Sequence, residues 1–235
     1  MSPQSDPRMY RECEIKYKIK DEAEKADLKN KIEALGFGFI SRNMETDFVP
    51  DVEGFLCRKK GILIRFRRVE KEDGECDTLV TMKIKGEAKT FQEYFELEYA
   101  YSAVDREVFE KINERLRQAT GIMLPESIHQ VTSFGELVKK VKEAGFSEHR
   151  ILLQKKRETY TNAAKKITFD FLPEGIGWYM EIETSDPEEL STLGKAIGLV
   201  HTQVEVQDYG EILKAHKKGL PDEEMRTGLF ANEPL

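Results

Sequence analysis

The amino-acid sequence predicts an α+β fold, a closed antiparallel β-barrel of eight strands with helices packed outside it. Eight segments alternate ionisable and apolar residues, which is the period-two pattern of strands with two unlike faces. Segments with helical periodicity interrupt them and need an apolar surface to cover. Like-charged residues also recur two positions apart, where they would repel one another without partners. Helices on the apolar faces would turn the charged faces inward, and eight strands can close around such an interior.

Composition narrows the class of protein. A chain of 235 residues suits one large domain or two small ones, and a hydrophobic fraction of 39% can build a substantial core. The net charge of −7 argues against non-specific nucleic-acid binding, and no stretch approaches the roughly 20 apolar residues of a membrane span. We therefore expect a small-molecule partner rather than nucleic acid or a membrane, and the sequence leaves the oligomeric state open.

Cysteine usage and the N-terminal residues indicate a cytoplasmic location. Cys13, Cys57 and Cys76 show no metal-ligand spacing, and their odd number does not suggest a disulfide framework. No apolar run follows Met1, so we expect no signal peptide.

The first strand of the barrel spans residues 12–20, after a polar segment over residues 1–9 that we expect to be flexible. Its charged face carries Glu12 and Glu14, followed by Lys16, and its other face is apolar. A helix over residues 21–35 comes next, because leucine and isoleucine recur at helical spacing, acidic residues begin it and a glycine ends it.

Four further strands complete the first half of the chain. Asp73 and Gly74 form a dipeptide suited to a tight hairpin turn, which joins two of these strands. Most of the strands again carry ionisable residues at every second position. The four segments are residues 37–49, 61–69, 78–85 and 92–99.

The second half again combines helices with alternating strands. A helix to about residue 119 starts at a capping signal over residues 102–105, and Ser133 with Glu136 forms a capping box that opens another. Pro187 marks the first turn of a third helix, and residues 208–216 form a short last one. The strands between them are residues 151–157, 165–171 and 178–184.

The charged faces of these strands are the candidate functional surface. Any one of them has an ordinary explanation, a sheet with one solvated face. Together they enclose carboxylates and cations in similar number, and buried charges need partners. A ligand with several phosphates would pair with the cations, and a divalent metal would pair with the carboxylates. The faces carry Glu12, Glu14 and Lys16; Glu45 and Asp47; Arg65 and Arg67; Lys83 and Lys85; Glu96 and Glu98; Lys155 and Arg157; Asp170; and Glu181 and Glu183.

These segments, taken in chain order, resemble the CYTH domain, also called the triphosphate tunnel metalloenzyme family. Glu12-x-Glu14-x-Lys16 matches the family's E-x-E-x-K signature. The resemblance covers about residues 10–215, so we assign residues 10–217 to one such domain and expect a flexible tail over residues 218–235. The other matching segments are Ile64-Arg65-Phe66-Arg67, Thr81-Met82-Lys83, Glu96-Leu97-Glu98, Lys155-Lys156-Arg157 with Tyr160, Asp170, and Gly177-Trp178-Tyr179-Met180-Glu181-Ile182-Glu183.

The resemblance implies a triphosphate tunnel with Mg²⁺ or Mn²⁺ as cofactor, and a division of roles among the charged residues. Five residues would be catalytic, namely Glu12, Glu14, Lys16, Glu181 and Glu183. The metal would be held by Glu12, Glu14, Asp170, Glu181 and Glu183. The phosphates would be bound by Lys16, Arg65, Arg67, Lys83, Lys85, Lys155 and Arg157. A second metal, or the positioning of cations, would fall to Glu96 and Glu98.

The implied function is metal-dependent hydrolysis of a triphosphate, and inorganic triphosphate requires least beyond the tunnel. Two alternatives stay open: a class IV adenylyl cyclase that converts ATP to cyclic AMP and pyrophosphate, and a non-catalytic polyphosphate-binding module. Two departures from the family pattern bear on the substrate. Val49 stands where the family often has a tyrosine, and Tyr94 stands where an arginine is expected. The sequence therefore leaves the identity of the triphosphate and the preference between the two metals undecided.

Overall fold

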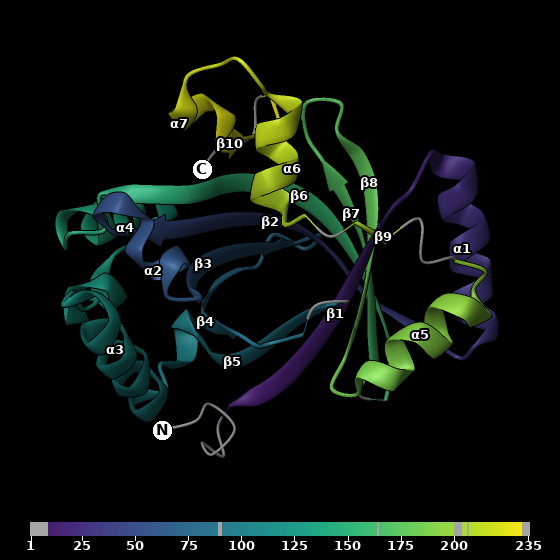
Figure 1. The fold of residues 1–235 in the computed structure, drawn as a ribbon, viewed down its shortest axis with the longest axis horizontal. Coiled ribbons are helices and arrows are strands. Elements are labelled where there is room, and N and C mark those ends of the chain that lie inside the picture. The colour runs from purple at the N-terminus through teal and green to yellow at the C-terminus, as the bar shows by residue number, and fades with distance from the viewer. Residues whose placement is uncertain (1–8, 89–90, 164, 200–203, 206, 232–235) are drawn as a thin grey trace.

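A closed antiparallel barrel forms the centre of the protein (Figure 1). The computed structural model describes residues 9–88, 91–163, 165–199, 204–205 and 207–231. The strands follow one another around the barrel in the order β6-β2-β3-β4-β5-β1-β8-β7, and β7 pairs back to β6. This closure confirms the predicted fold class. The strands are β1 (Tyr10–Lys18), β2 (Gly38–Asp51), β3 (Ile62–Lys71), β4 (Cys76–Lys85), β5 (Gln92–Ala100), β6 (Glu148–Asn162), β7 (Lys165–Leu172) and β8 (Gly177–Thr184).

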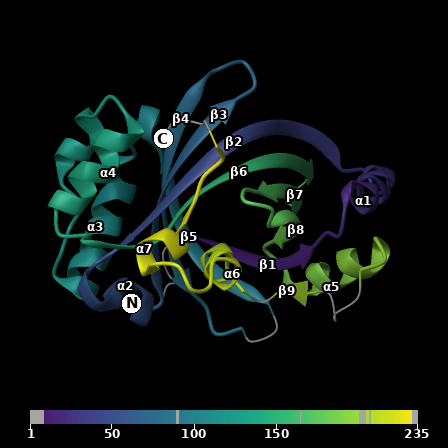
Figure 2. The same cartoon turned by 90° about the horizontal axis from the view of Figure 1, so that it is seen from above.

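Helices cover the barrel on two sides and at one end. In Figures 1 and 2, α2, α3 and α4 lie on one side, α1 and α5 lie on the other, and α6 crosses between them. Polar caps set their starts: Asp21, Asp105 and Ser133 each accept a backbone N–H in the first turn of the helix that follows. The helices are α1 (Glu22–Ala34), α2 (Leu56–Lys59), α3 (Arg106–Thr120), α4 (Phe134–Glu143), α5 (Pro187–Ala196), α6 (Tyr209–His216) and α7 (Asp222–Met225).

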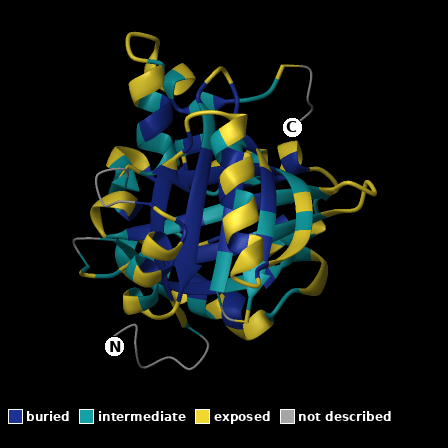
Figure 3. Ribbon diagram, turned by 90° about the vertical axis from the view of Figure 1, so that its right-hand side faces the viewer, coloured by how far each residue is buried: buried dark blue, intermediate teal, exposed yellow. Residues whose placement is uncertain are grey.

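The apolar faces of the strands point outward into two cores. One core lies between strands β2, β3, β4 and β5 and helices α3 and α4. It includes Phe66 and Leu97 from the strands and Phe109 from α3. The other joins β1, β7 and β8 with α1 and α5, and includes Ile15 and Met180. Figure 3 shows the strands largely buried beneath helices whose outer faces are exposed. Because the apolar side chains lie outside the barrel, its charged faces are turned inward, as the alternation predicts.

A third, smaller core closes one end of the barrel. Val49 and Leu153 point into the barrel near this end, and Ile212 and Leu213 of α6 pack with them. Asp208 and Glu211 form a capping box that fixes the start of α6. This end of the lumen is therefore apolar and is covered by a helix, whereas the remainder of the lumen is charged.

Several boundaries differ from those predicted. β6 is twice as long as the segment 151–157, because its first residues pair with Pro50 and Asp51 beyond a register shift and its last pair with β7. α3 begins at Arg106 rather than near residue 102, because the residues from Tyr101 to Ala103 form a 3-10 turn before the Asp105 cap.

The expectation of a flexible tail over residues 218–235 stays a prediction. Within that segment, α7 and the short strand β10 (Thr227–Gly228) follow α6, and β10 runs parallel to β6. Arg226 is buried and bonds the carbonyl of His149, while the Phe230 N–H bonds Gln154. Another short strand, β9 (Val204–Glu205), pairs with β1. Of residues 1–9, which were predicted to be flexible, residues 1–8 lie outside the described residues.

None of the helices in the described part of the chain is both long and apolar enough to cross a membrane.

Candidate active site

The barrel encloses a cavity of about 550 Å³, which we call the tunnel. Of the eight barrel strands, each except β7 contributes two or more lining residues from its charged face, and β7 contributes Lys166. The inward residues come from all around the barrel, so the strand closure itself brings together groups that are far apart in the sequence. The predicted residues on its wall are Glu12, Glu14, Lys16, Arg65, Arg67, Lys83, Glu96, Glu98, Lys155, Arg157, Glu181 and Glu183.

Two predicted residues have other positions. Asp170 is fully buried behind the tunnel wall, where its carboxylate is bonded by protein groups. Lys85 is exposed at the last position of β4 and lines a neighbouring cavity instead of the tunnel. Alternation along β4 correctly puts Lys85 on the face of Lys83, but the strand ends before that face is enclosed.

The first group of charges joins β2 to β3. Arg67 donates two parallel hydrogen bonds to Asp47, of 2.6 and 2.8 Å, and lies 3.1 Å from a carboxylate oxygen of Glu45. Although burial alone would raise the pKa of both carboxyl groups, Arg67 holds the pKa of each below its ordinary value. Glu45 and Asp47 therefore stay ionised, and they orient the guanidinium within the tunnel wall.

The second group is built around Asp170. The Arg157 guanidinium donates to both of its oxygens, at 2.6 and 2.5 Å, and also donates to Glu181 at 2.6 Å. The Lys155 ammonium lies 3.3 Å from Asp170 and 3.4 Å from Glu45. Burial, together with the positive charges of Arg157 and Arg67, lowers the pKa of Lys155. Asp170 is thus positioned to hold two tunnel cations in place rather than to contact a ligand.

The third group lies where β1 pairs with β8. Glu14 is opposite Glu183, and Lys16 is opposite Glu181. The Lys16 ammonium lies 3.5 Å from Glu14 and 3.3 Å from Glu181. Burial and the neighbouring Glu181 carboxylate raise the pKa of Glu14 to about 8. Despite its burial, Glu181 has a pKa well below its ordinary value, because Lys16 and Arg157 stabilise its charge. At neutral pH this carboxyl pair therefore retains a proton.

The fourth group joins β4 to its neighbours β3 and β5 and to β1. The Lys83 ammonium donates to Glu12 at 2.6 Å and also contacts Glu96. Arg65 donates to the Thr81 hydroxyl at 3.3 Å, and that hydroxyl donates to Glu98 at 2.7 Å. The Nε atom of Arg65 is buried and makes no hydrogen bond within the described residues. This donor is available to an anionic oxygen in the tunnel.

Tyr209 enters the tunnel from α6. Its hydroxyl donates to Asp170 at 2.7 Å, so burial and that carboxylate hold its pKa well above its ordinary value. The ammonium nitrogens of Lys16 and Lys155 lie 4.2 and 5.1 Å from the centre of its ring, within reach of cation–π attraction. A tyrosine ring thus occupies the region below the helix that covers the tunnel, and it contacts two of the predicted phosphate-binding lysines.

Four of the predicted metal ligands fit a hard divalent cation by their chemistry. Glu12, Glu14, Glu181 and Glu183 present carboxylate oxygens from two adjacent strands, and such oxygens are preferred by Mg²⁺ and Mn²⁺. The proton retained by the Glu14 and Glu181 pair marks a place where positive charge is favoured. In the described part of the chain, however, no three acidic, histidine or cysteine side chains converge closely enough to hold a metal ion. Lysine ammonium groups lie between the carboxylates. The carboxylates would have to give up these contacts in order to bind the metal.

Some residues of the site were not assigned a role from the sequence. Glu45 and Asp47 were recognised as a charged face, but their partners lie on β3 and β6, and their register is not visible in the sequence. Tyr209 carries no strand alternation and reaches the tunnel only because α6 packs across the end of the barrel. Arg58 of α2 and Arg150 of β6 also line the tunnel, and they pair with Glu211 of α6 and with Asp208 at its cap, at 2.9 and 3.0 Å respectively.

Comparison with known proteins gives the same fold. The PH1819 protein of Pyrococcus horikoshii is similar over 87% of this chain and 99% of its own, with a TM-score of 0.61 and 18% identity. A "putative adenylate cyclase" of Vibrio parahaemolyticus is similar over 87% and 98%, with a TM-score of 0.57 and 18% identity. A "putative adenylyl cyclase" of Hippeastrum is similar over 91% and 98%, with a TM-score of 0.51 and 13% identity. At these identities the likeness shows the fold alone. No curated protein sequence matches.

The fold and the site define a class of protein, a closed β-barrel whose lumen is lined by interlocked carboxylates and cations. The CYTH domain model matches residues 10–214, so the chain belongs to the CYTH domain family. That family includes triphosphatases and adenylyl cyclases, and its domains bind triphosphate substrates. The family resemblance found in the sequence is thereby confirmed.

Proposed function

We propose that this protein is a divalent-metal-dependent hydrolase that binds a triphosphate compound in the tunnel and releases orthophosphate. One observation supports this most strongly: the tunnel cations are already paired with tunnel carboxylates, as in the contacts of Arg67, Arg157 and Lys83. A triphosphate with its metal can take over both sets at once, because the phosphate oxygens pair with the cations and the metal pairs with the carboxylates. A binding module for anions alone would need fewer carboxylates.

Arginine and lysine side chains would bind and orient the phosphates. Arg65 has a free buried donor, and Arg67 and Arg157 are fixed by bidentate contacts with Asp47 and Asp170, so little rotamer freedom remains to be lost on binding. Fixed positive groups around the terminal phosphate stabilise the charge that its equatorial oxygens carry as the bond to the leaving phosphate breaks. These residues would thus strengthen the binding of the triphosphate and also speed the cleavage of its terminal phosphate.

Carboxylates at the β1 and β8 pair would hold the metal and handle protons. Glu12, Glu14, Glu181 and Glu183 are the residues that would bind it. When bound, Mg²⁺ or Mn²⁺ would neutralise phosphate charge and lower the pKa of a coordinated water. The neighbouring tunnel carboxylates can accept the proton of the attacking water. Water would then attack the terminal phosphorus, and the bond from that phosphorus to the bridging oxygen would break.

The Hippeastrum protein, described as a "putative adenylyl cyclase" with a dominant triphosphatase activity, supports the choice of hydrolysis over cyclisation. The test is to incubate the purified protein with Mg²⁺ or Mn²⁺ and, separately, inorganic triphosphate, thiamine triphosphate and ATP, and to measure orthophosphate and cyclic AMP. Orthophosphate from at least one of the three is the expected result. Cyclic AMP as the main product from ATP would replace the proposal with a cyclase, and tight binding without turnover would replace it with a binding module.

A further inference from the structure

The first residues of β2 have a strand neighbour on one side only. β2 pairs with β6 from Gly38 to Asp51, whereas its pairing with β3 begins only at Asn43. Within the described part of the chain, no strand pairs with residues 38–42 on the side of β3, and we call this segment the open edge. An unpaired strand edge presents backbone N–H and C=O groups to which another extended chain can add.

Apolar side chains are exposed at the open edge. Phe39 is 51% and Ile40 is 60% exposed, and Leu35, just before β2, is 40% exposed. These are three of the six large apolar side chains that are exposed among the described residues. A β-bulge between Phe39 and Ser41 leaves Ile40 without a partner on β6, which accounts for its exposure. Free edges are usually protected by charged residues or proline, so clustered apolar side chains here indicate an interaction surface.

Beside the open edge, three cations share one buried carboxylate. Glu158 of β6 lies opposite Arg42 in the ladder, and its oxygens lie 2.9 Å from the Lys25 ammonium, 3.3 Å from the Arg42 guanidinium and 3.9 Å from the Lys29 ammonium. The side chains of Arg42 and Lys29 remain 52% and 33% exposed. Arg42 also contacts Glu72 at 3.3 Å, but both partners are exposed, so that pair contributes little and is easily exchanged. Arg42 and Lys29 can therefore donate to carboxylates of a partner.

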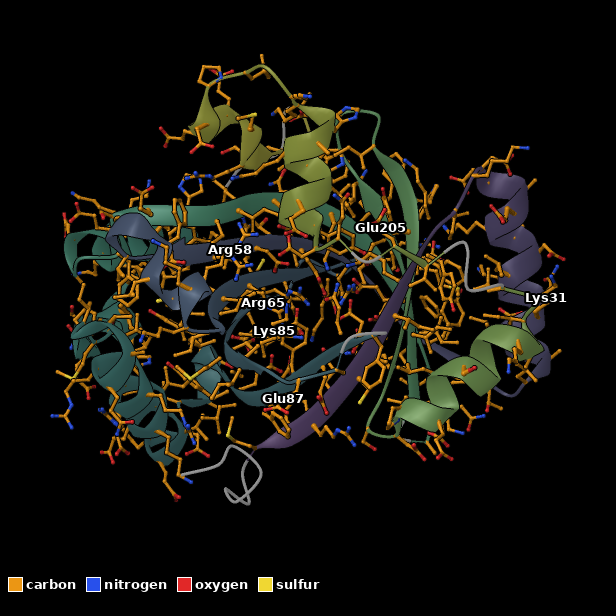
Figure 4. The ribbon with its side chains drawn as sticks, viewed as in Figure 1. Lys31, Arg58, Arg65, Lys85, Glu87 and Glu205 are labelled. Carbon is orange, nitrogen blue, oxygen red and sulfur yellow. The ribbon has the colours of Figure 1, made fainter. Side chains whose placement is uncertain are left out.

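Tyr160 joins the apolar part of this surface to its charged part. Its ring packs edge to face on Phe39, with the ring centres 5.4 Å apart, and the Lys29 ammonium lies 5.6 Å from the centre of the same ring. Figure 4 shows Lys31, which is on the same helix as Lys29, at the outer edge of the molecule. The apolar and basic side chains thus form one continuous surface along α1 and the open edge.

Charge and backbone groups distinguish among the partners that would cover such a surface. A second copy of this chain would bring Lys29 and Arg42 close to their own copies across a two-fold axis, where like charges repel. The hydrocarbon of a lipid surface has no hydrogen-bonding groups for the backbone of the open edge. An extended peptide with acidic and apolar side chains can pair with that backbone, cover Phe39 and Ile40, and bring carboxylates to the cations.

We propose that the open edge docks an acidic, apolar segment of a partner protein, which adds to β2 as a further strand. Its backbone would extend the sheet on the side that β3 leaves free, and its carboxylates would pair with Lys29 and Arg42. None of residues 38–42 borders the tunnel or the cavity beside it, so this docking site is separate from the proposed active site and does not depend on it.

The test measures binding of three fluorescein-labelled peptides to the full chain by fluorescence anisotropy. In the first peptide glutamate alternates with valine, in the second lysine replaces the glutamates, and in the third two successive central residues of the first are proline, which cannot donate to a strand. Ile40→Ser removes an exposed apolar side chain, and Lys29→Gln removes a charge. Their matched controls lie elsewhere on the surface: Met123→Ser, at a side chain of a residue that is 51% exposed, and Lys139→Gln, at a side chain that is 75% exposed.

The glutamate peptide should bind the wild type, and the lysine and proline peptides should bind at least about 10-fold more weakly. Ile40→Ser should weaken the glutamate peptide by about 10-fold and Lys29→Gln by about 2- to 5-fold. Both controls should stay within about 2-fold of the wild type. As a second readout, the bound peptide should slow amide hydrogen exchange in residues 38–42 more than in α3.

Four results would overturn the proposal. The first is failure of the glutamate peptide to bind at about 1 mM, and the second is equal binding of the lysine or the proline peptide. The third is a dimer in analytical ultracentrifugation that Ile40→Ser abolishes, which would make a second copy the occupant. The fourth is binding to phosphatidylserine vesicles that Ile40→Ser abolishes, which would make a lipid surface the occupant. Because the open edge lies outside the tunnel, none of these results bears on the proposed hydrolysis.

Discussion

Asp170 offers the sharpest test of how the tunnel is held together. Its carboxylate is fully buried, accepts two bonds from Arg157 and one from Tyr209, and lies 3.3 Å from Lys155. Asp170→Asn keeps the shape of the side chain and removes its charge, which leaves two buried cations without their shared counter-ion. Breaking a buried ion pair from one side costs about 3–5 kcal/mol. For a chain of 235 residues, each kcal/mol lowers the melting temperature by about 2–4 °C, so we expect a loss of about 6–20 °C.

The assay is urea denaturation of the metal-free protein, with thermal melting as a second readout. Glu98→Gln is the matched control, because Glu98 also faces the tunnel but its side chain is 29% exposed and it lies 3.8 Å from Arg65. We expect that control to lose about 1 kcal/mol or less. Inorganic triphosphate should restore part of the stability lost in Asp170→Asn, because its charge replaces the missing carboxylate. A loss below about 1 kcal/mol for Asp170→Asn, or equal losses in both variants, would refute the assignment of Asp170 as the anchor of the tunnel cations.

Four other predictions concern the metal, the proton held by Glu14 and the covering helix. Glu14→Gln and Glu181→Gln should each lower turnover at least about 100-fold, which is more than the loss expected for a residue that only supports a metal ligand. Addition of EDTA to the wild type should abolish turnover. Steady-state phosphate release measures the effects of the variants and of EDTA, and full activity in either variant would remove that residue from the metal site. Mg²⁺ should displace the proton held by Glu14, whose pKa is about 8, so the apparent affinity of the protein for Mg²⁺ should weaken as the pH falls below 8. Calorimetry in two buffers of different ionisation enthalpy counts the protons released when Mg²⁺ binds. No proton release at pH 7 would contradict this prediction. Because this pKa is raised from an ordinary 4.5, the contribution of Glu14 to stability is greatest below pH 4.5 and is lost as the pH rises through 8, which urea titrations across that range would detect. Tyr209→Phe removes one hydrogen bond to a carboxylate, which contributes about 1.5–3 kcal/mol to stability. The substitution should therefore speed amide hydrogen exchange in α6 by more than in α1. An equal change of exchange rate in the two helices would show that the hydroxyl does not hold α6 in place.

Strand alternation predicted most of the barrel and the direction of its charged faces. The reason is physical: a strand with one apolar and one ionic face has few stable arrangements, and helices with apolar stripes must cover the apolar face. Glu12, Lys83 and Glu181 therefore lie in the tunnel as expected. Their partners could not be predicted, because each ion pair joins strands whose relative register is set only when the barrel closes.

The ends of the barrel were less predictable than its wall. Tyr209 and the segment after residue 217 act through packing of short elements, and a two-residue strand such as β10 has no period to detect. Lys85 shows the limit of alternation itself. The pattern continues to the last residue of β4, whereas enclosure by neighbouring strands does not. Sequence periodicity indicates which face a residue is on, and only the fold indicates whether that face is enclosed.

The most direct test of the account is a single turnover experiment with ATP and Mg²⁺ in water enriched in ¹⁸O. Hydrolysis at the terminal phosphorus forms one new bond from the water oxygen to that phosphorus, so the account predicts one label in orthophosphate and none in ADP. Label in pyrophosphate or AMP would place the attack at another phosphorus. Unlabelled pyrophosphate formed together with cyclic AMP would contradict hydrolysis altogether and identify a cyclase.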